Sequence, residues 1–185
     1  MLRGPRVTLR AFTKADMARL LQFSQDMEVE VLCGGNPPVP WTQEAWDKWF
    51  DEHLGTEQKT SVNFGIEADN NLIGTCGLWS FNQTAQTCDL GIGIGEREYW
   101  GRGYGREAVE LLLEYAFQIR NFRKVSLTSS STNERALRCY QACGFVEEGR
   151  LRQHLWVNGQ FVDVVHMGIL RDEWRRRREN EDLSE

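Results

Sequence analysis

A cluster of glycines is the strongest chemical signal in the sequence. Gly101, Gly103 and Gly105 stand between a segment of alternating apolar residues and an amphipathic segment that begins near Ala108. Glycines let the main chain approach a ligand closely and adopt positive φ, and the first turn of a helix presents unpaired N–H groups. The pattern predicts a phosphate-binding turn, although a plain strand-to-helix connection would also use glycine here.

The two common nucleotide-binding loops do not fit this segment. A dinucleotide fingerprint that starts at Gly101 requires glycine where Arg106 stands, and one that starts at Gly91 requires it where Glu96 stands. A P-loop requires a Gly-Lys pair, which the sequence lacks. The loop therefore predicts a phosphate ligand outside the usual NAD and ATP classes.

A second motif follows the glycine loop downstream. Asn133 and Ala136 precede Tyr140, and Gly144 with Phe145 ends the segment. Asparagine is a good helix N-cap and glycine a good C-cap, so the motif predicts a short helix that carries Tyr140.

In this order and at this separation, the two motifs resemble the GNAT superfamily of acyl-CoA-dependent N-acetyltransferases. That family's pyrophosphate loop has the form Gln/Arg-x-x-Gly-x-Gly/Ala, so Gly103 and Gly105 match, whereas Trp100 replaces the usual Gln or Arg. The resemblance covers nearly the whole chain and is closest to the RimJ/RimL branch, which includes polyamine acetyltransferases. Residues 22–60 match least, and in this superfamily that region and the last hairpin usually line the acceptor site.

The resemblance implies a single GNAT-like domain that transfers acetyl from acetyl-CoA directly to a primary amine, without a metal. In the family, the main chain of the strand before the loop binds the pantetheine arm and polarises the acetyl carbonyl. The implied cofactor-binding residues are Ile92, Gly93, Ile94, Trp100, Gly101, Arg102, Gly103, Tyr104, Gly105 and Asn133.

Tyr140 occupies the position of the family's general acid, which protonates the coenzyme A thiolate; packing behind the Gly144 turn is the structural alternative. Asp89 shares the strand alternation of the glycines at 91 and 93, and it is the candidate base, acting through water, or the partner of an arginine. Glu28 and Glu30 could instead hold a cationic acceptor. Proton loss to water without a dedicated base is equally open.

Two other hypotheses for the function remain open. A covalent acyl-cysteine route would need a cysteine with a nearby base, and none of the five cysteines has such a sequence context. A non-catalytic GNAT-like module that keeps coenzyme A as a ligand or sensor is the second alternative. Lone histidines such as His154 and His166 are more often packed or surface residues than catalysts.

Composition restricts the class of protein. The chain has 185 residues, 41% of them hydrophobic, a net charge of −5 and no apolar run of membrane-spanning length. It has no CxxC or Cys/His ligand spacing, which disfavours a structural zinc site. We therefore expect a cytosolic protein that binds neither nucleic acid nor membrane and that could form a homodimer.

The charge is unevenly distributed. Residues 13–57 hold nine acids and three bases, so this segment has a net charge of −6 while the remainder of the chain has +1. An acidic segment on the acceptor side suggests a cationic amine such as a polyamine, an aminoglycoside or a basic protein N-terminus. A solvated helical face would give the same pattern.

Hydrophobic periodicity predicts an α+β domain over residues 1–174 and a charged, fraying tail over residues 175–185. We expect a mixed, mostly antiparallel sheet of about seven strands flanked by about four helices. The expected strands are residues 6–12, 61–68, 72–79, 87–94 and 124–128 and the two that flank Asn158-Gly159. The expected helices are one that begins after Thr13 and ends before Gly34, one after Thr42, and those over residues 108–121 and 133–142.

Overall fold

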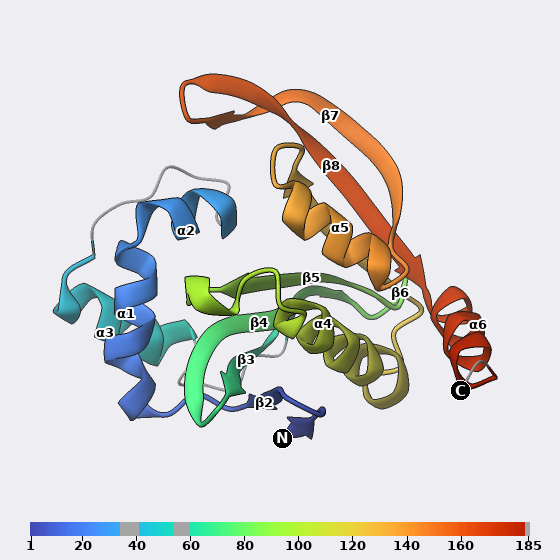
Figure 1. Cartoon of the computed structure of the whole chain (residues 1–185), viewed down its shortest axis with the longest axis horizontal. Helices are drawn as coiled ribbons and strands as arrows, with labels where there is room; N and C mark the ends of the chain where they lie inside the picture. The colour runs from blue at the N-terminus through green and yellow to red at the C-terminus, as the bar shows by residue number, and fades with distance from the viewer. Residues whose placement is uncertain (34–40, 54–59, 184–185) are drawn as a thin grey trace.

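The computed structural model describes residues 1–33, 41–53 and 60–183, and these residues form an eight-stranded sheet with helices on both faces (Figure 1). The strands lie in the order β1-β2-β3-β4-β5-β6-β8-β7, and only β5 and β6 are parallel neighbours. The strands are β1 (Leu2–Arg3), β2 (Thr8–Arg10), β3 (Val62–Ala68), β4 (Asn71–Asn82), β5 (Thr87–Ile94), β6 (Lys124–Ser130), β7 (Val146–Val157) and β8 (Gln160–Leu170). The described helices are α1 (Met17–Gln25), α2 (Met27–Cys33), α3 (Gln43–His53), α4 (Tyr104–Glu114), α5 (Glu134–Ala142) and α6 (Arg171–Asp182).

This architecture confirms the expected α+β fold and its mixed, mostly antiparallel sheet. The extra strand is β1, which pairs Leu2 with Leu9 of β2 and is too short to show alternation in a sequence. The strand expected over residues 6–12 is shorter, and in the described ranges α2 and α6 raise the number of α-helices from about four to six.

The expected first helix is divided at Asp26. This residue has an extended main chain, with φ −80° and ψ 102°, so α1 ends there. Its carboxylate oxygen Oδ1 accepts hydrogen bonds from the N–H groups of Glu28 (3.0 Å) and Val29 (3.3 Å). Asp26 is therefore the N-terminal cap of α2, because its side chain satisfies N–H groups that have no helical partner.

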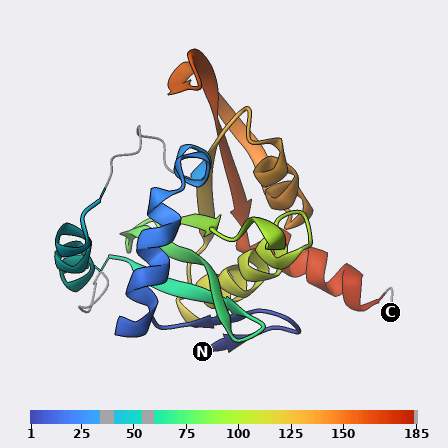
Figure 2. The same cartoon turned by 60° about the vertical axis from the view of Figure 1, so that its left-hand side comes forward.

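Consecutive residues of β3 show that the sheet has a core on each face. A side chain at Gly65 would contact Phe12 and Leu72, which pack with α1 and α3, whereas Ile66 lies in the main core under α4. Since successive residues of a strand point to opposite faces, α1 and α3 cover one face and α4 covers the other. Figure 2 shows α1, α2 and α3 on one side of the central strands and α5 and α6 on the other.

The parallel strands β5 and β6 separate after a short common stretch. Three residue pairs join them, from Thr87 opposite Lys124 to Asp89 opposite Ser126, although both strands continue beyond this point. Past Asp89, β5 keeps its pairing with β4 but has no partner on its other edge among the described residues. The sheet therefore opens into a gap whose two sides are the ends of β5 and β6.

The C-terminal residues form a docked helix. Trp174 of α6 is buried against Phe117, with 5.4 Å between ring centroids, and Arg177 Nη2 donates a 2.7 Å hydrogen bond to Glu110 Oε1 of α4. The expected fraying of the charged segment is therefore wrong at Arg177, while the domain boundary at residue 174 stays a prediction. None of the described helices has the length and apolar character needed to cross a membrane.

Candidate active site

A cavity of about 1350 Å³ occupies the gap between β5 and β6. It is lined by residues of β5 that point to both faces of the sheet, among them Asp89 and Gly91 on one face and Leu90 and Ile92 on the other. The cavity therefore has two ends. We name the end on the α4 and α5 face the cofactor end, and the end on the α1 and α3 face the acceptor end.

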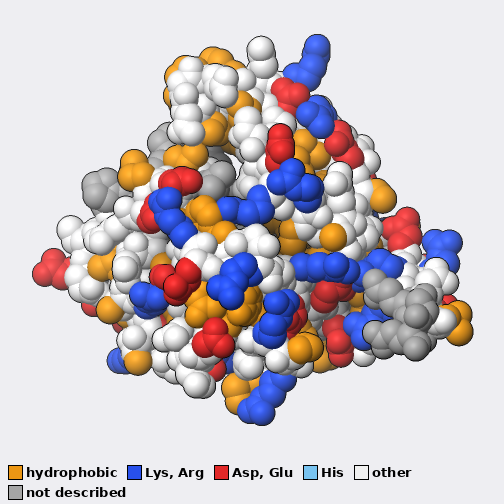
Figure 3. All heavy atoms as spheres, viewed as in Figure 1, with side chains coloured by type: hydrophobic (Ala, Val, Ile, Leu, Met, Phe, Trp, Pro, Cys, Tyr) orange, Lys and Arg blue, Asp and Glu red, His pale blue; other side chains and the backbone are white. Residues whose placement is uncertain are grey.

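The glycine loop and the first turn of α4 form part of the cofactor end. Gly103, at φ 89°, is the N-cap of α4, and Gly101, at φ 69°, faces open space. Three arginines, Arg106, Arg135 and Arg138, line this end. Figure 3 shows Lys and Arg side chains gathered around the N-terminal ends of α4 and α5. Unpaired N–H groups, a helix dipole and three cations together suit the phosphates of coenzyme A.

The main chain of β5 offers further hydrogen-bonding groups. The N–H of Gly95 donates to the carbonyl of Ile73 on β4 (2.9 Å). Because main-chain groups alternate sides along an antiparallel strand, odd-numbered residues of β5 turn them toward β4 and even-numbered residues turn them toward the gap. Ile92 and Ile94 therefore present main-chain groups to the cavity, whereas Gly93 directs its own toward β4. Of the three β5 residues expected to bind the cofactor, Ile92 and Ile94 can do so through the main chain, and Gly93 cannot.

Trp100 connects the glycine loop to β5. Its indole nitrogen Nε1 donates a 2.7 Å hydrogen bond to the carbonyl oxygen of Ile94, and the guanidinium carbon of Arg135 lies 3.7 Å from the indole ring centroid. The side chain that replaces the family's Gln or Arg thus holds the loop against the strand, and it places a cation from α5 beside the loop.

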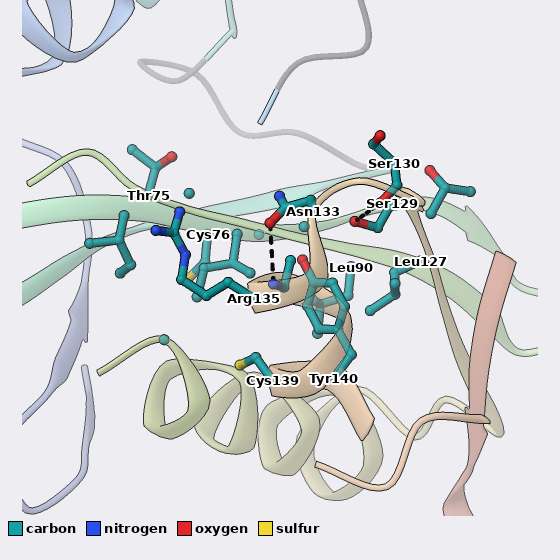
Figure 4. Close-up of a pocket in the computed structure, with 18 of the residues that line it drawn as sticks. Thr75, Cys76, Leu90, Leu127, Ser129, Ser130, Asn133, Arg135, Cys139 and Tyr140 are labelled. Atoms are coloured by element: carbon teal, nitrogen blue, oxygen red, sulfur yellow. Dashed lines mark hydrogen bonds between the residues drawn. The ribbon is translucent and has the colours of Figure 1, made fainter. Parts of the chain in front are cut away.

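Asn133 and Tyr140 line the cofactor end from α5. Asn133 Oδ1 accepts a 3.2 Å hydrogen bond from the N–H of Ala136, as expected of an N-cap (Figure 4). Tyr140 is buried and packs edge-to-face on Phe145, with 5.9 Å between ring centroids. Figure 4 shows the Tyr140 ring directed from α5 toward Leu90 of β5. Tyr140 therefore both packs behind the turn and reaches the cavity.

Two of the expected cofactor residues direct their side chains elsewhere. The ring of Tyr104 is buried against Tyr99, with 4.9 Å between ring centroids. The guanidinium of Arg102 donates to the carbonyl of Glu98 (3.2 Å). Neither residue lines the cavity, so only their main-chain groups in the loop and the first turn of α4 could serve the cofactor. The roles of the other cofactor residues stay predictions.

Asp89 lies at the acceptor end, on the opposite face from Tyr140. It is paired across the sheet with Trp79 of β4 and Ser126 of β6, at the last residue pair before the gap. His166 of β8 is opposite Thr128 and also lines the cavity, as does His154 of β7. Asp89 is thus the carboxylate that the structure places at the opening between the two faces, and its role as a base stays a prediction.

Within the part of the chain that the structure describes, three acids of residues 13–57 are paired with arginines from other elements. Asp16 accepts two 2.8 Å hydrogen bonds from the guanidinium of Arg10, which hold the pKa of this carboxyl below its ordinary value. Arg97 forms a 2.7 Å ion pair with Asp26 and also bonds Glu28. These pairs reduce the acidic excess that suggested attraction of a cation, but they do not remove it. The side chain of Glu30 lies outside what the structure describes.

One contact that positions the glycine loop has no signal in the sequence. Glu107 Oε1 accepts hydrogen bonds from the N–H groups of Arg6 (2.7 Å) and Val7 (2.8 Å), and Arg6 Nη1 donates to the carbonyl of Arg102 (2.9 Å). The chain start therefore fastens the loop and the first turn of α4. The partners lie about a hundred residues apart, so periodicity and motif spacing could not reveal them.

Comparison with known proteins agrees with this geometry. The family model described as "Acetyltransferase (GNAT) domain" matches residues 6–146. The chain therefore belongs to the GNAT acetyltransferase family, and it is an acetyl-CoA-dependent N-acetyltransferase.

Two relatives and one solved structure resemble the chain over nearly its whole length. The chain is 29% identical to a spermidine N(1)-acetyltransferase of Vibrio cholerae serotype O1, over 94% of this chain and 98% of the relative. It is 32% identical to the Bacillus subtilis (strain 168) protein named "Putative ribosomal N-acetyltransferase YdaF", over 91% and 93%. The crystal structure of spermidine N-acetyltransferase from Vibrio cholerae in complex with CoA and spermine has a TM-score of 0.84 at 26% identity, with 93% and 99% covered.

Proposed function

We propose that the enzyme transfers acetyl directly between two substrates that occupy opposite ends of the cavity. The observation that carries this proposal is the separation of β5 from β6 after Asp89, which joins the two faces of the sheet through one cavity. Tyr140 lines it from α5, and Asp89 lies on the other face. An amine can therefore attack from one face while the thiol leaves on the other.

The side chains have complementary tasks in this arrangement. Acetyl-CoA supplies the activated acetyl group. The N–H groups of Ile92 and Ile94 face the gap and orient the acyl chain. Asp89 accepts a proton from the incoming ammonium, through water, so that the amine nitrogen can form its bond to the acetyl carbon. Tyr140 Oη donates its proton to the sulfur as the carbon–sulfur bond breaks, and the second proton that the nitrogen loses as the amide forms passes through water to the tyrosinate, which restores Tyr140.

A covalent acyl-cysteine route is poorly supported by the described cysteines. Burial raises the pKa of the Cys76 thiol, and burial also raises that of Cys88 to about 12, so neither forms a thiolate at neutral pH. Cys139 lines the cavity, but Figure 4 shows its sulfur directed toward α4. Direct transfer needs none of these residues.

The acceptor in this proposal is a cationic primary amine. Two observations support it: Asp89 at the acceptor end can attract an ammonium ion, and a similar solved structure is named for spermidine acetylation. Mass spectrometry of a mixed pool of polyamines, aminoglycosides, alkylamines and short peptides incubated with acetyl-CoA tests the proposal. We expect an acetylated amine. Acetyl-CoA binding without any acetylated amine would contradict the proposed acceptor class.

A further inference from the structure

We infer that the acceptor end selects a primary monoamine carried on an apolar body, and that Trp79 and Asp89 form the subsite for its amino group. The inference rests on the proposed function and names its acceptor class. It starts from the pairing of Trp79 with Asp89 across β4 and β5, which puts an indole and a carboxylate side by side on one face of the sheet.

Gly91 determines where the Trp79 ring lies. A Cβ atom at Gly91 would be 2.1 Å from Cη2 of the indole and 2.9 Å from Cζ2, so only glycine lets the ring lie against this part of β5. Trp79 nevertheless remains 41% exposed inside a concave site. A large aromatic face beside a carboxylate is suited to an ammonium group, which gains from both the ring quadrupole and the negative charge.

Three further tryptophans line the same cavity. Trp46 and Trp49 of α3 stack with 5.3 Å between ring centroids and 28° between ring planes, and both line the cavity. Trp156, near the tip of the β7–β8 hairpin, also lines the cavity and is 58% exposed. These rings can bury an alkyl or aryl group, and this burial stabilises the complex. A polar acceptor body would gain less from the same contacts.

The charges of the cavity set the number of positive charges that an acceptor can carry. Among the described residues that line it, Asp89 is the only carboxylate. The nearby acids Asp26 and Glu28 are bonded to Arg97. Among the described lining residues, a second ammonium group would find no second carboxylate to balance its charge, so part of its hydration cost would stay uncompensated. A monoamine avoids that cost.

A pair of amines with the same chain length tests this inference. Hexylamine and 1,6-diaminohexane differ in one amino group, and 2-phenylethylamine adds an aromatic body. We would measure their dissociation constants for the full-length protein saturated with CoA by calorimetry, and kcat/KM with acetyl-CoA by mass spectrometry. We expect both monoamines to bind at least about tenfold more tightly than the diamine and to be acetylated more efficiently. Equal or tighter binding of 1,6-diaminohexane or spermidine would overturn the inference.

Variants connect the selectivity to the named residues. Trp79→Leu should raise the dissociation constant of hexylamine about fivefold to tenfold and leave that of CoA unchanged. Gly91→Ala should have the same effect, since its methyl group displaces the indole, whereas Gly149→Ala, which faces open space, should have none. Unchanged hexylamine binding in Trp79→Leu would remove Trp79 from the subsite, even if Gly91→Ala failed to fold.

The two measurements separate this inference from the proposed function. Calorimetry requires no turnover, so selective binding of monoamines without product would leave the inference standing and contradict the proposed function. Efficient acetylation of spermidine in preference to hexylamine would support the proposed function and contradict the inference.

Discussion

The indole N–H of Trp100 donates a 2.7 Å hydrogen bond to the carbonyl oxygen of Ile94. This bond joins the glycine loop to the end of β5, where the main chain faces the cavity. It also occupies a carbonyl that would otherwise be unpaired at the edge of the gap. A residue that departs from the family's loop pattern therefore has a structural task of its own.

Trp100→Phe removes this bond and keeps an aromatic ring beside Arg135. A hydrogen bond of this kind contributes about 1 kcal/mol, so we expect the dissociation constant of acetyl-CoA to rise about fivefold. Isothermal titration calorimetry measures it. Trp41→Phe, outside the cavity lining, is the matched control and should bind normally. An unchanged constant in Trp100→Phe would show that the loop keeps its place without the bond.

Gly103 and Gly105 form a matched pair for the loop. Gly103 has φ 89° and an added Cβ would lie 2.9 Å from Arg6 Nη2, whereas a Cβ at Gly105 would lie 3.9 Å from Ile94, an ordinary contact. Gly103→Ala should therefore weaken acetyl-CoA binding about tenfold, since a left-handed alanine costs about 1–2 kcal/mol and the loop must rearrange. Gly105→Ala should change the dissociation constant less than threefold. The opposite order would place the phosphates elsewhere.

Tyr140→Phe tests the general acid. The ring packs on Phe145, so the variant should keep the fold and the affinity for acetyl-CoA. Loss of a positioned proton donor typically lowers the rate by about 10²–10⁴-fold, and we expect kcat to fall within that range. Steady-state kinetics followed by mass spectrometry would measure it, with circular dichroism as the control for folding. A kcat near that of the wild type would mean that Tyr140 contributes packing and is not the general acid.

Local signals predicted most of the fold. Asn158-Gly159 marked the last hairpin, and both residues have the positive φ of a tight turn, 48° and 84°. Asn133 and Gly144 marked the two ends of α5, as the N-cap and a residue with φ 92°. Each of these signals depends on the conformation of one or two residues, so the sequence contains all the information that is needed.

Contacts between distant segments were not predictable in the same way. The position of the Trp79 ring against Gly91 depends on the register of β4 and β5. The ion pair between Arg97 and Asp26 depends on how α2 packs beside β5. The sequence showed an acidic segment, and the pairing of two of its acids, Asp26 and Glu28, with Arg97 became visible only in three dimensions. The acceptor end, which is built from such contacts, was consequently the least predictable part of the site.

Asp16 makes stability depend on pH. Its pair with Arg10 lowers the pKa of the carboxyl in the folded state, so the stabilising contribution is complete above the unfolded pKa of about 3.9. It is lost as the pH falls through the lower folded value. Asp16→Asn should reduce the free energy of unfolding at pH 7 by about 2 kcal/mol, because Arg10 loses one of its two carboxylate partners and keeps only Glu67. The difference from the wild type should shrink in urea titrations below pH 4, and Asp47→Asn, an exposed control, should stay within about 0.5 kcal/mol.

Asp89→Asn tests the acceptor end of the mechanism. Asparagine keeps the shape of the side chain but neither attracts an ammonium ion nor accepts its proton, so kcat/KM for the amine should fall by about 10²-fold at pH 7. The dissociation constant of acetyl-CoA should stay the same, since Asp89 lies on the face opposite Tyr140.

The pH dependence of Asp89→Asn gives the stricter test. An alkylamine has a pKa near that of lysine, about 10.4, so raising the pH supplies more neutral amine from solution and replaces the missing proton acceptor. We therefore expect kcat/KM of the variant to rise toward that of the wild type between pH 7 and pH 10. A deficit that stays constant across this range would mean that Asp89 orients the amine without taking its proton, and proton loss to water would then be the better account.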